Sequence, residues 1–373
     1  MPATDRRTDW KGWIREAAAR LGFDLCGISS AATPARDREQ YLWWLEEGFH
    51  GEMKYMERPQ RQDIRRLLPR VRSVICAAMV YNTPYPKSTE SPDATRGWIS
   101  RYAWGEDYHG VLQDRLEKLL QELRAVVGDP FDAKIYVDTG PLLERALARA
   151  AGLGWIAKNT CLIHQKLGSW FVVGEILTSL ELEPDQPVPD RCGACTRCID
   201  ACPTAAIVKP HVLDATRCIS YFTIELQGTI PEEHRAGMGR HVFGCDICQD
   251  VCPWNRKAPF TPLPKFQPRT DSFDPRGGES AREPEKHFPA PNIFNPPLDW
   301  LASLTEEEFR KLFRRSPLRR ARYQGLLRNV AVAMGNSREP KFLPILQKLA
   351  EYPDPIVQEH ARWALRKLDS REN

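Results

Sequence analysis

The chain has no apolar run long enough to cross a membrane. A membrane-spanning helix needs roughly 18 or more consecutive apolar residues, and no stretch here approaches that length. The first residues, MPATDRRTDWKGW, also contain no apolar core of the kind that a signal peptide carries. We therefore expect a cytoplasmic protein with no membrane partner, in a reducing environment where disulfides are rare.

Two short nucleotide-binding motifs are also missing. No G-x-G-x-x-G follows an expected strand, and no G-x-x-x-x-G-K-[ST] loop occurs in the 373 residues. The sequence therefore gives no support for a dinucleotide site or a P-loop. A redox partner must be a cofactor without a short sequence signature, or an external protein.

Neither sign of charge dominates the chain, because 53 Lys and Arg stand against 49 Asp and Glu, for a net charge of +4. Residues 310–328, however, contain no acidic residue. Their basic residues are Arg310, Lys311, Arg314, Arg315, Arg319, Arg320, Arg322 and Arg328. Such a segment suits contact with a phosphate backbone, although a solvated helical face explains the charge almost equally well.

Cysteine is concentrated, since eight of the 11 cysteines lie between residues 192 and 252. A first run, C-x2-C-x2-C-x3-C-P, begins at residue 192 and has the bacterial ferredoxin spacing. A second run, C-x2-C-x3-C-P, begins at Cys245 but has Val242 where a further cysteine is expected, and Cys218 is the obvious replacement. We predict one [4Fe–4S] cluster on Cys192, Cys195, Cys198 and Cys252, and a second on Cys202, Cys218, Cys245 and Cys248.

Structural zinc is the alternative for these cysteines, because CxxC pairs also form zinc sites. A zinc site does not need two consecutive runs that both end in CP, so clusters are favoured. A pair of clusters implies redox chemistry elsewhere in the chain. The remaining thiols, Cys26, Cys76 and Cys161, are interpreted as packing groups.

Strand and helix patterns alternate up to residue 180 and indicate an α/β domain over residues 1–180. We expect strands at 23–28, 73–80, 133–137 and 170–177, and helices at 10–21, 41–47, 111–127 and 142–151. The predicted fold class is therefore α+β with several domains.

Three further regions follow. Residues 181–260 form the cysteine-rich module and residues 261–297 a proline-rich connecting segment. Residues 298–373 are helical, with helices at 323–334, 342–350 and 355–368, and DPIVQEHARWALRKL resembles the second helix of a HEAT-type repeat. One or two repeats are too few for a free solenoid, so these helices should pack against the rest.

Asp138 lies between an expected strand and an expected helix, and open α/β sheets hold ligands at the carboxyl ends of their strands. A helix N-cap is favoured from position alone, and an ion pair with Arg145 is a further alternative. In a closed apolar cavity, desolvation would raise the pKa of this carboxyl and allow it to donate a proton.

Two other segments are candidates for ligand binding. Lys158 and Asn159 lie in a glycine-flanked loop that could hold a large cofactor, although a plain turn is the simpler interpretation. Residues 100–109 combine Arg101, aromatic residues and His109 in a mixture typical of binding clefts. His109, His164 and His241 lack metal-ligand spacing and are interpreted as structural or supporting groups.

Seven segments, in order along nearly the whole chain, together resemble the epoxyqueuosine reductase family. They are SRYAWGEDYH, VDTGPLLER, GWIAKNTCLI, GSWFVVGEILT, CGACTRCIDACPTAAI, CISYFTIEL and GCDICQDVCPWN. The resemblance implies a cytoplasmic oxidoreductase that reduces epoxyqueuosine to queuosine at the tRNA wobble position, the last step of queuosine synthesis, with cobalamin and [4Fe–4S] clusters. It further implies a cobalamin-binding domain related to nitroreductase-like folds with the corrin bound base-off, a ferredoxin-like module, and a HEAT-like C-terminal domain.

The resemblance also implies roles for particular residues and partners. Asp138 matches the family's proton donor, and the implied corrin contacts are Arg58, Arg101, Lys158, Asn159, Ser220 and Gln227. The implied substrate is tRNA carrying epoxyqueuosine, with Arg314, Arg315, Arg319 and Arg320 as phosphate contacts and Tyr102 and Trp104 as candidates for base stacking. An external low-potential electron donor of the flavodoxin or ferredoxin type and a monomeric state are expected.

Two other functions are alternatives to this one. Reductive dehalogenases combine cobalamin with the same pair of clusters, but they usually carry a twin-arginine export signal. Arg6 and Arg7 are not followed by an apolar segment. A non-enzymatic electron carrier or HEAT scaffold would leave the 180-residue α/β domain unexplained.

Overall fold

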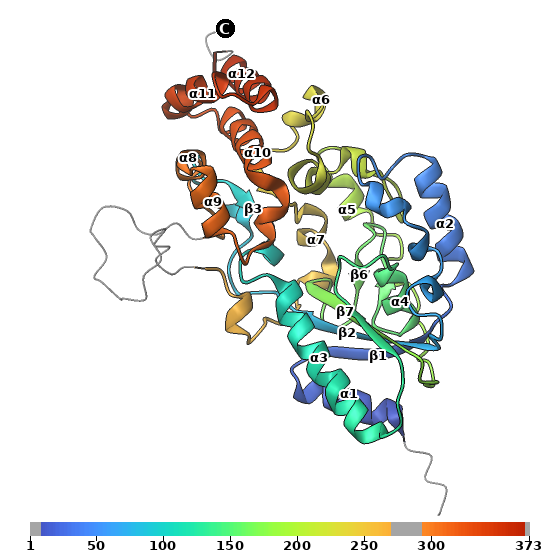
Figure 1. Ribbon diagram of the computed structural model, residues 1–373. Coiled ribbons are helices and arrows are strands. Elements are labelled where there is room, and N and C mark those ends of the chain that lie inside the picture. Colours follow the sequence, from blue (N-terminus) through green and yellow to red (C-terminus); the bar gives the residue numbers. More distant parts are fainter. Residues whose placement is uncertain (1–8, 270–292, 370–373) are drawn as a thin grey trace, which may run out of the picture.

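The computed structural model describes residues 9–269 and 293–369 (Figure 1). Arg6 and Arg7, and residues 270–292 of the predicted connecting segment, lie outside the described residues. Within the described ranges, no helix combines the length and the apolar character needed to cross a membrane.

A four-stranded sheet forms the centre of the N-terminal part (Figure 1). Its order is β1 (Leu25–Ser30), β2 (Ser73–Val80), β7 (Phe171–Thr178) and β4 (Ala133–Tyr136). The alternation of strands and helices agrees with the sequence, but all three strand pairs are antiparallel. The argument that placed a ligand at the carboxyl ends of the strands is therefore wrong, because neighbouring strands end at opposite edges.

Helices cover both faces of this sheet. The helices α1 (Trp10–Arg20) and α3 (Tyr108–Val127) pack on one face, and α4 (Glu144–Ala150) packs on the other (Figure 1). Along β2, Ile75 joins the apolar core under α1 and α3, whereas Val74 and Cys76 join the core under α4. Burial on both faces explains why β2 is apolar from Val74 to Val80.

Shorter elements connect the sheet to the cysteine-rich module. The strand β10 (His241–Phe243) pairs in parallel with β3 (Trp98–Ile99), so the module is joined to the N-terminal part by backbone hydrogen bonds. The remaining elements of this region are α2 (Ala35–Glu46), β5 (Trp155–Ile156), β6 (Leu162–Ile163), α5 (Arg197–Asp200), β8 (Ile207–Lys209), β9 (Val212–Leu213), α6 (Glu232–Arg235) and α7 (Ile247–Asp250).

The C-terminal helices share an apolar core with the cysteine-rich module, as expected for helices too few to form a free solenoid. They are α8 (Leu298–Ser303), α9 (Glu306–Leu312), α10 (Arg322–Ser337), α11 (Leu343–Ala350) and α12 (Pro355–Asp369). The helix α10 packs against α12, β10 and a π-helix at Tyr221–Glu225. The HEAT-like nature of these helices and the domain boundaries at 180, 260 and 297 stay predictions.

Arg328 shows that the basic segment is not a single surface. It is 1 % exposed, and its guanidinium donates to the backbone oxygens of Leu226 at 2.8 Å and Gly228 at 2.7 Å. Burial lowers the pKa of Arg328 to about 10. Its charge joins α10 to the segment after the π-helix and is not available to a phosphate.

Candidate active site between the sheet and the cysteine-rich module

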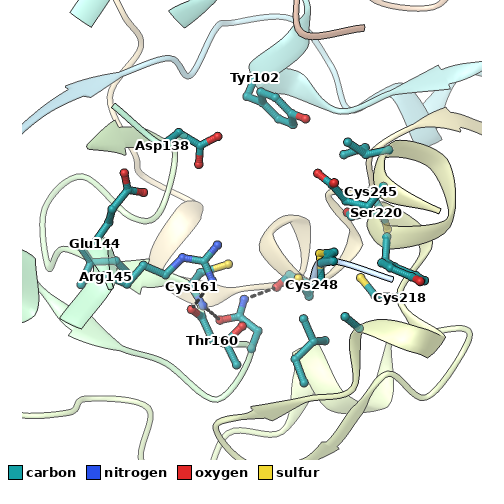
Figure 2. A pocket seen from close by; sticks show the side chains of 18 of the residues that line it. Tyr102, Asp138, Glu144, Arg145, Thr160, Cys161, Cys218, Ser220, Cys245 and Cys248 are labelled. Carbon is teal, nitrogen blue, oxygen red and sulfur yellow. Dashed lines mark hydrogen bonds between the residues drawn. The ribbon is translucent and has the colours of Figure 1, made fainter. Parts of the chain in front are cut away.

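A large cavity lies between the α4 side of the sheet, the cysteine-rich module and the segment before α10. Its volume is about 1280 Å³ (Figure 2). Pockets for small molecules usually measure roughly 300–1000 Å³. The cavity therefore has room for a large cofactor together with part of a substrate.

Four cysteines line the inner wall of this cavity, and they are the predicted ligands of the second cluster: Cys202, Cys218, Cys245 and Cys248. Cys245 follows β10 and Cys248 lies on α7. Cys218 donates its N–H to Ala215 O at 2.9 Å and precedes the π-helix, an element often found at functional sites. Val242, where the spacing of the second run leads one to expect a cysteine, is 0 % exposed in the apolar core. Cys218 lines the cavity in its place.

The other four predicted ligands, Cys192, Cys195, Cys198 and Cys252, surround a smaller cavity of about 40 Å³. The Lys158 ammonium group closes one side, donating to Gly193 O at 2.7 Å and Cys195 O at 3.0 Å. Lys158 therefore lies at the first predicted cluster and does not line the large cavity.

The cysteines fit iron–sulfur clusters by their number and their grouping. All eleven are free thiols. In the described ranges, no three His, Cys, Asp or Glu side chains converge to hold a single metal ion. Two groups of four thiols around two separate hollows are the donor set that two [4Fe–4S] cubes require.

A buried carboxylate positions the second group of cysteines. Asp246, between Cys245 and Cys248, accepts hydrogen bonds from the Ser100 hydroxyl and, at 2.6 Å, from the Arg101 N–H. The Arg101 side chain is buried, donates to Thr83 O at 2.9 Å and does not line the cavity. The structure thus places Arg101 in a structural network behind the cluster site.

Asp138 faces the cavity from a strained turn. Its φ of 53° lies in the left-handed region that residues other than glycine rarely adopt. The helix α4 begins at Glu144 with Leu143 as its N-cap, so the N-cap interpretation of Asp138 is wrong. Leu142, which was expected in the helix, lies before it, and its carbonyl oxygen accepts a hydrogen bond from the Arg61 guanidinium at 2.6 Å. The Asp138 side chain is 55 % exposed and lines the cavity opposite Cys245 and Cys248 (Figure 2).

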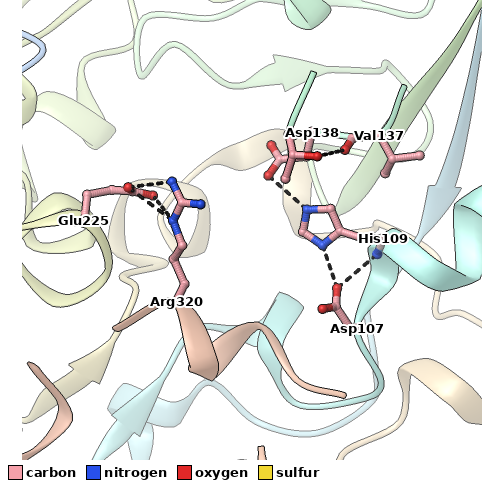
Figure 3. A network of polar contacts seen from close by, with 7 residues as sticks. Asp107, His109, Val137, Asp138, Glu225 and Arg320 are labelled. Atoms are coloured by element: carbon pink, nitrogen blue, oxygen red, sulfur yellow. Dashed lines mark hydrogen bonds and ion pairs between the residues drawn. The ribbon is translucent and has the colours of Figure 1, made fainter. Parts of the chain in front are cut away.

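His109 connects Asp138 to a second carboxylate (Figure 3). Its Nε2 lies 3.3 Å from Asp138 Oδ2, and its Nδ1 lies 2.6 Å from Asp107 Oδ1. Burial lowers the pKa of His109, but the hydrogen bonds to Asp107 and Asp138 outweigh this effect and raise it to about 9. At neutral pH the imidazole is therefore protonated.

The pKa of Asp138 moves in the opposite direction to the expectation. Burial raises it, but the hydrogen bond and positive charge of His109 prevail, and the net shift is downward. The rise expected for a closed apolar cavity does not occur, because the cavity wall supplies the His109 cation. Within the Asp138–His109 pair, the proton therefore resides mainly on the imidazole.

Two buried carboxyl groups behind Asp138 were missed in the sequence. Glu175 on β7 pairs in register with Cys76 and Tyr136 and is 0 % exposed. Among the described residues, neither of its carboxyl oxygens has a hydrogen-bond partner. Burial raises the pKa of Glu175 well above its ordinary value and that of Glu144 to about 8. The acidic residue inside the apolar strand FVVGEILT was the signal that could have revealed this group.

The remaining predicted cofactor contacts divide into two sets. Arg58, Asn159 and Ser220 line the large cavity, and the Asn159 amide donates to Cys248 O at 3.3 Å. Gln227 lines neither cavity, and its amide donates to Glu225 O at 3.1 Å. Cys161, interpreted as a packing thiol, lines the large cavity close to Cys248.

The two aromatic residues proposed for base stacking also differ. Tyr102 lines the cavity (Figure 2). Trp104 is 1 % exposed and donates its indole N–H to Ile99 O at 2.7 Å. Stacking of Trp104 on a base is therefore wrong, because both faces of its ring are buried in the core.

The basic segment reaches the mouth of the cavity. Arg319 and Arg320 line it, whereas Arg314 and Arg315 are exposed outside it. Arg320 forms an ion pair with Glu225 at 2.9 Å (Figure 3) and lies over the ring of Tyr55. The basic segment thus adds two guanidinium groups to the cavity lining, and that of Arg320 is paired with Glu225.

Comparison with known proteins identifies relatives along the whole chain. The family model described as "Epoxyqueuosine reductase QueG, DUF1730" matches residues 61–139, and that of a 4Fe-4S double cluster binding domain matches residues 191–255. The epoxyqueuosine reductase of Xanthomonas campestris is 40 % identical over 365 residues, which cover 96 % of each chain.

Two solved structures are similar over 96 % of this chain and 90 % of their own, each at 31 % identity. One is an epoxyqueuosine reductase with a tRNA-Tyr epoxyqueuosine-modified stem loop, with a TM-score of 0.83. The other is the Bacillus subtilis enzyme with an aspartate-bearing catalytic loop swung out of the active site, with a TM-score of 0.82.

Replacing Glu175 by Gln should stabilise the protein as the pH rises. Because the folded pKa of Glu175 is raised, its contribution to stability is fully present below the ordinary pKa of 4.5 and is lost as pH rises through the folded pKa. The loss is at most about 1.4 kcal/mol per pH unit. The neutral amide does not ionise and so does not suffer this loss. Between about pH 5.5 and about pH 8.5, the thermal midpoint of Glu175→Gln should therefore rise relative to that of the unmodified protein.

The matched control is Glu183→Gln, at an exposed position shortly after β7. Its thermal midpoint should follow that of the unmodified protein throughout. A Glu175→Gln variant with the same pH dependence as the unmodified protein would show that Glu175 is ionised in the folded state.

Proposed function

Because the chain belongs to the epoxyqueuosine reductase family of oxidoreductases, we propose that it reduces epoxyqueuosine in the tRNA anticodon to queuosine. The observation that carries this proposal is the cavity of about 1280 Å³, which is lined by Asp138, by the four cysteines of the second predicted cluster and by Arg319 and Arg320. A proton source, an electron source and a site for a polyanion thus meet in one space. The stem loop in the similar structure makes tRNA the macromolecule to test.

We propose cobalamin, bound base-off, as the cofactor of the large cavity. The volume is suitable, and Arg58, Asn159 and Ser220 would hold its polar groups. Two histidines line the cavity, and both are engaged by carboxylates, His109 by Asp138 at 3.3 Å and His211 by Asp190 at 3.4 Å. This arrangement suits a corrin without a histidine ligand from the protein. When bound, cobalamin would supply a strongly reducing and nucleophilic cobalt centre, the chemistry that reduction of an epoxide requires.

Two [4Fe–4S] clusters would carry electrons to this cavity. The first cluster, on Cys192, Cys195, Cys198 and Cys252, would lie at the smaller hollow, and the second, on Cys202, Cys218, Cys245 and Cys248, at the cavity wall. Conversion of the epoxide to an alkene consumes two electrons and two protons and releases water. Single electrons would therefore pass through the clusters twice in each turnover.

Asp138 and His109 would supply a proton to the departing oxygen. His109 donates its Nε2 proton towards Asp138 Oδ2, and Asp138 faces the cavity. As the epoxide oxygen gains negative charge, a proton passed through Asp138 lowers the barrier to its departure. The aspartate-bearing catalytic loop of the Bacillus subtilis relative supports this assignment.

The two-cluster proposal predicts the iron content. Protein purified without oxygen should contain about eight irons per chain. Cys218→Ala should lower this to about four, because only the second set of thiols loses a member. Cys26→Ala, a thiol of β1 outside both sets, should retain the full content. Stoichiometric zinc with almost no iron, or full iron in Cys218→Ala, would contradict the assignment.

The acid proposal predicts a selective loss of turnover. Asp138→Asn should keep iron and bind cobalamin, but its single-turnover rate on epoxyqueuosine-containing stem loop should fall by about 10²- to 10⁴-fold. The rate of the unmodified enzyme should decline as pH rises through about 9, where His109 loses its proton, and His109→Asn should lack this decline.

Asp114→Asn, on the exposed side of α3, is the matched control and should turn over normally. Normal turnover by Asp138→Asn, with intact cofactors, would remove the acid role.

The tRNA proposal predicts salt-dependent binding through the basic segment. Changing Arg314, Arg315, Arg319 and Arg320 to Ala should weaken binding of an anticodon stem loop and flatten its dependence on salt, by a slope of about one for each lost phosphate contact. Arg20→Ala with Arg124→Ala, on the helices that cover the opposite face of the sheet, should change neither. Unchanged affinity in the first variant would return the segment to a solvated surface.

A further inference from the structure

The smaller hollow opens onto a surface rimmed by positive charge. Arg197 lines the hollow, Arg191 precedes Cys192, and Arg256 and Lys257 follow the lining residue Trp254. All four side chains are exposed. We call these four residues the cationic rim. Within residues 9–269 and 293–369, no ion pair is found for any of them.

The carboxylates beside the rim do not neutralise it. Asp190 accepts a hydrogen bond from the Cys192 N–H at 2.7 Å and faces His211, and Asp200 accepts one from the Thr196 hydroxyl at 2.8 Å. Lys158 and Arg197 line the hollow, and Arg191, Arg256 and Lys257 lie within three positions of a lining residue in the chain. The surface that covers the first cluster site is therefore positively charged.

The position of this surface separates it from the RNA site. The large cavity is assigned above to the cofactor and the substrate base, with Arg319 and Arg320 at its mouth. The smaller hollow is lined by a different set of cysteines, and its neighbours Gly193, Ala194 and Pro253 are exposed. An electron donor can approach there while tRNA stays bound.

We propose that the cationic rim is the docking surface for an acidic one-electron carrier protein. This proposal rests on the iron–sulfur clusters of the proposed function. In each encounter the carrier is oxidised by one electron and the first cluster is reduced by one. The second cluster then accepts that electron, and two encounters supply one turnover. Opposite charge accelerates such brief encounters, which bury little surface.

The test measures reduction of the clusters by a purified acidic flavodoxin in its fully reduced form. In the variant Arg197→Glu, Arg256→Glu, Lys257→Glu, the second-order rate of cluster bleaching at low salt should fall at least about tenfold. The difference should shrink as salt screens the charges. The matched control reverses Arg20, Lys118 and Arg124 on α1 and α3 and should react at the original rate.

Two further measurements separate this proposal from the one beneath it. Iron content and full reduction by dithionite should be the same in the rim variant and in the unmodified protein. If the unmodified protein itself contained no iron and could not be reduced by dithionite, the cluster assignment would be defeated instead. Flavodoxin reduction of the rim variant at the original rate would overturn the docking surface. If that unchanged rate were accompanied by weaker binding of the stem loop, the rim would be an RNA contact instead.

Discussion

The site depends on the connection between the cysteine-rich module and the N-terminal part. The parallel pairing of β10 with β3 fixes the backbone just before Cys245. The Asp246 carboxylate then accepts hydrogen bonds from the Ser100 hydroxyl and the Arg101 N–H. Charge-assisted hydrogen bonds of this kind are strong when buried. This connection holds Cys245 and Cys248 across the cavity from Asp138. The Asn159 amide, which donates to Cys248 O at 3.3 Å, adds a second link between the two parts.

The same connection explains why Arg101 is buried. Its backbone supports Asp246, and its guanidinium donates to Thr83 O and packs over the ring of Trp104. Arg101 in the motif SRYAWGEDYH therefore lies in a structural network and does not line the cavity, although the resemblance implied a corrin contact for it. Its place behind the cluster site shows how a motif can be specific for a fold as well as for a ligand.

The sequence predicted those features that depend on local pattern. The apolar run at 73–80 corresponds to β2 without a shift in its ends, and the spacing of the cysteines divided them into the same two groups that surround the two hollows. Features that depend on distant contacts were not predictable. His109 and Asp138 are 29 residues apart, and no periodicity indicates that their side chains meet. The antiparallel order of the sheet and the burial of Arg328 likewise arise from packing between distant segments.

Charged groups mark three separate places in the molecule: the Asp138–His109 pair, the large cavity beside Arg319 and Arg320, and the cationic rim. A protonated His109 keeps Asp138 anionic, so a proton is held beside this carboxylate without an uncompensated charge. Behind them, Glu144 and Glu175 have raised pKa values and add little negative charge near neutral pH. In the proposed function, Arg319 and Arg320 would face the RNA, and the cationic rim would face the electron carrier beside the first cluster. Each partner would then meet positive charge at its own entrance, and the tRNA would not need to leave between the two electrons.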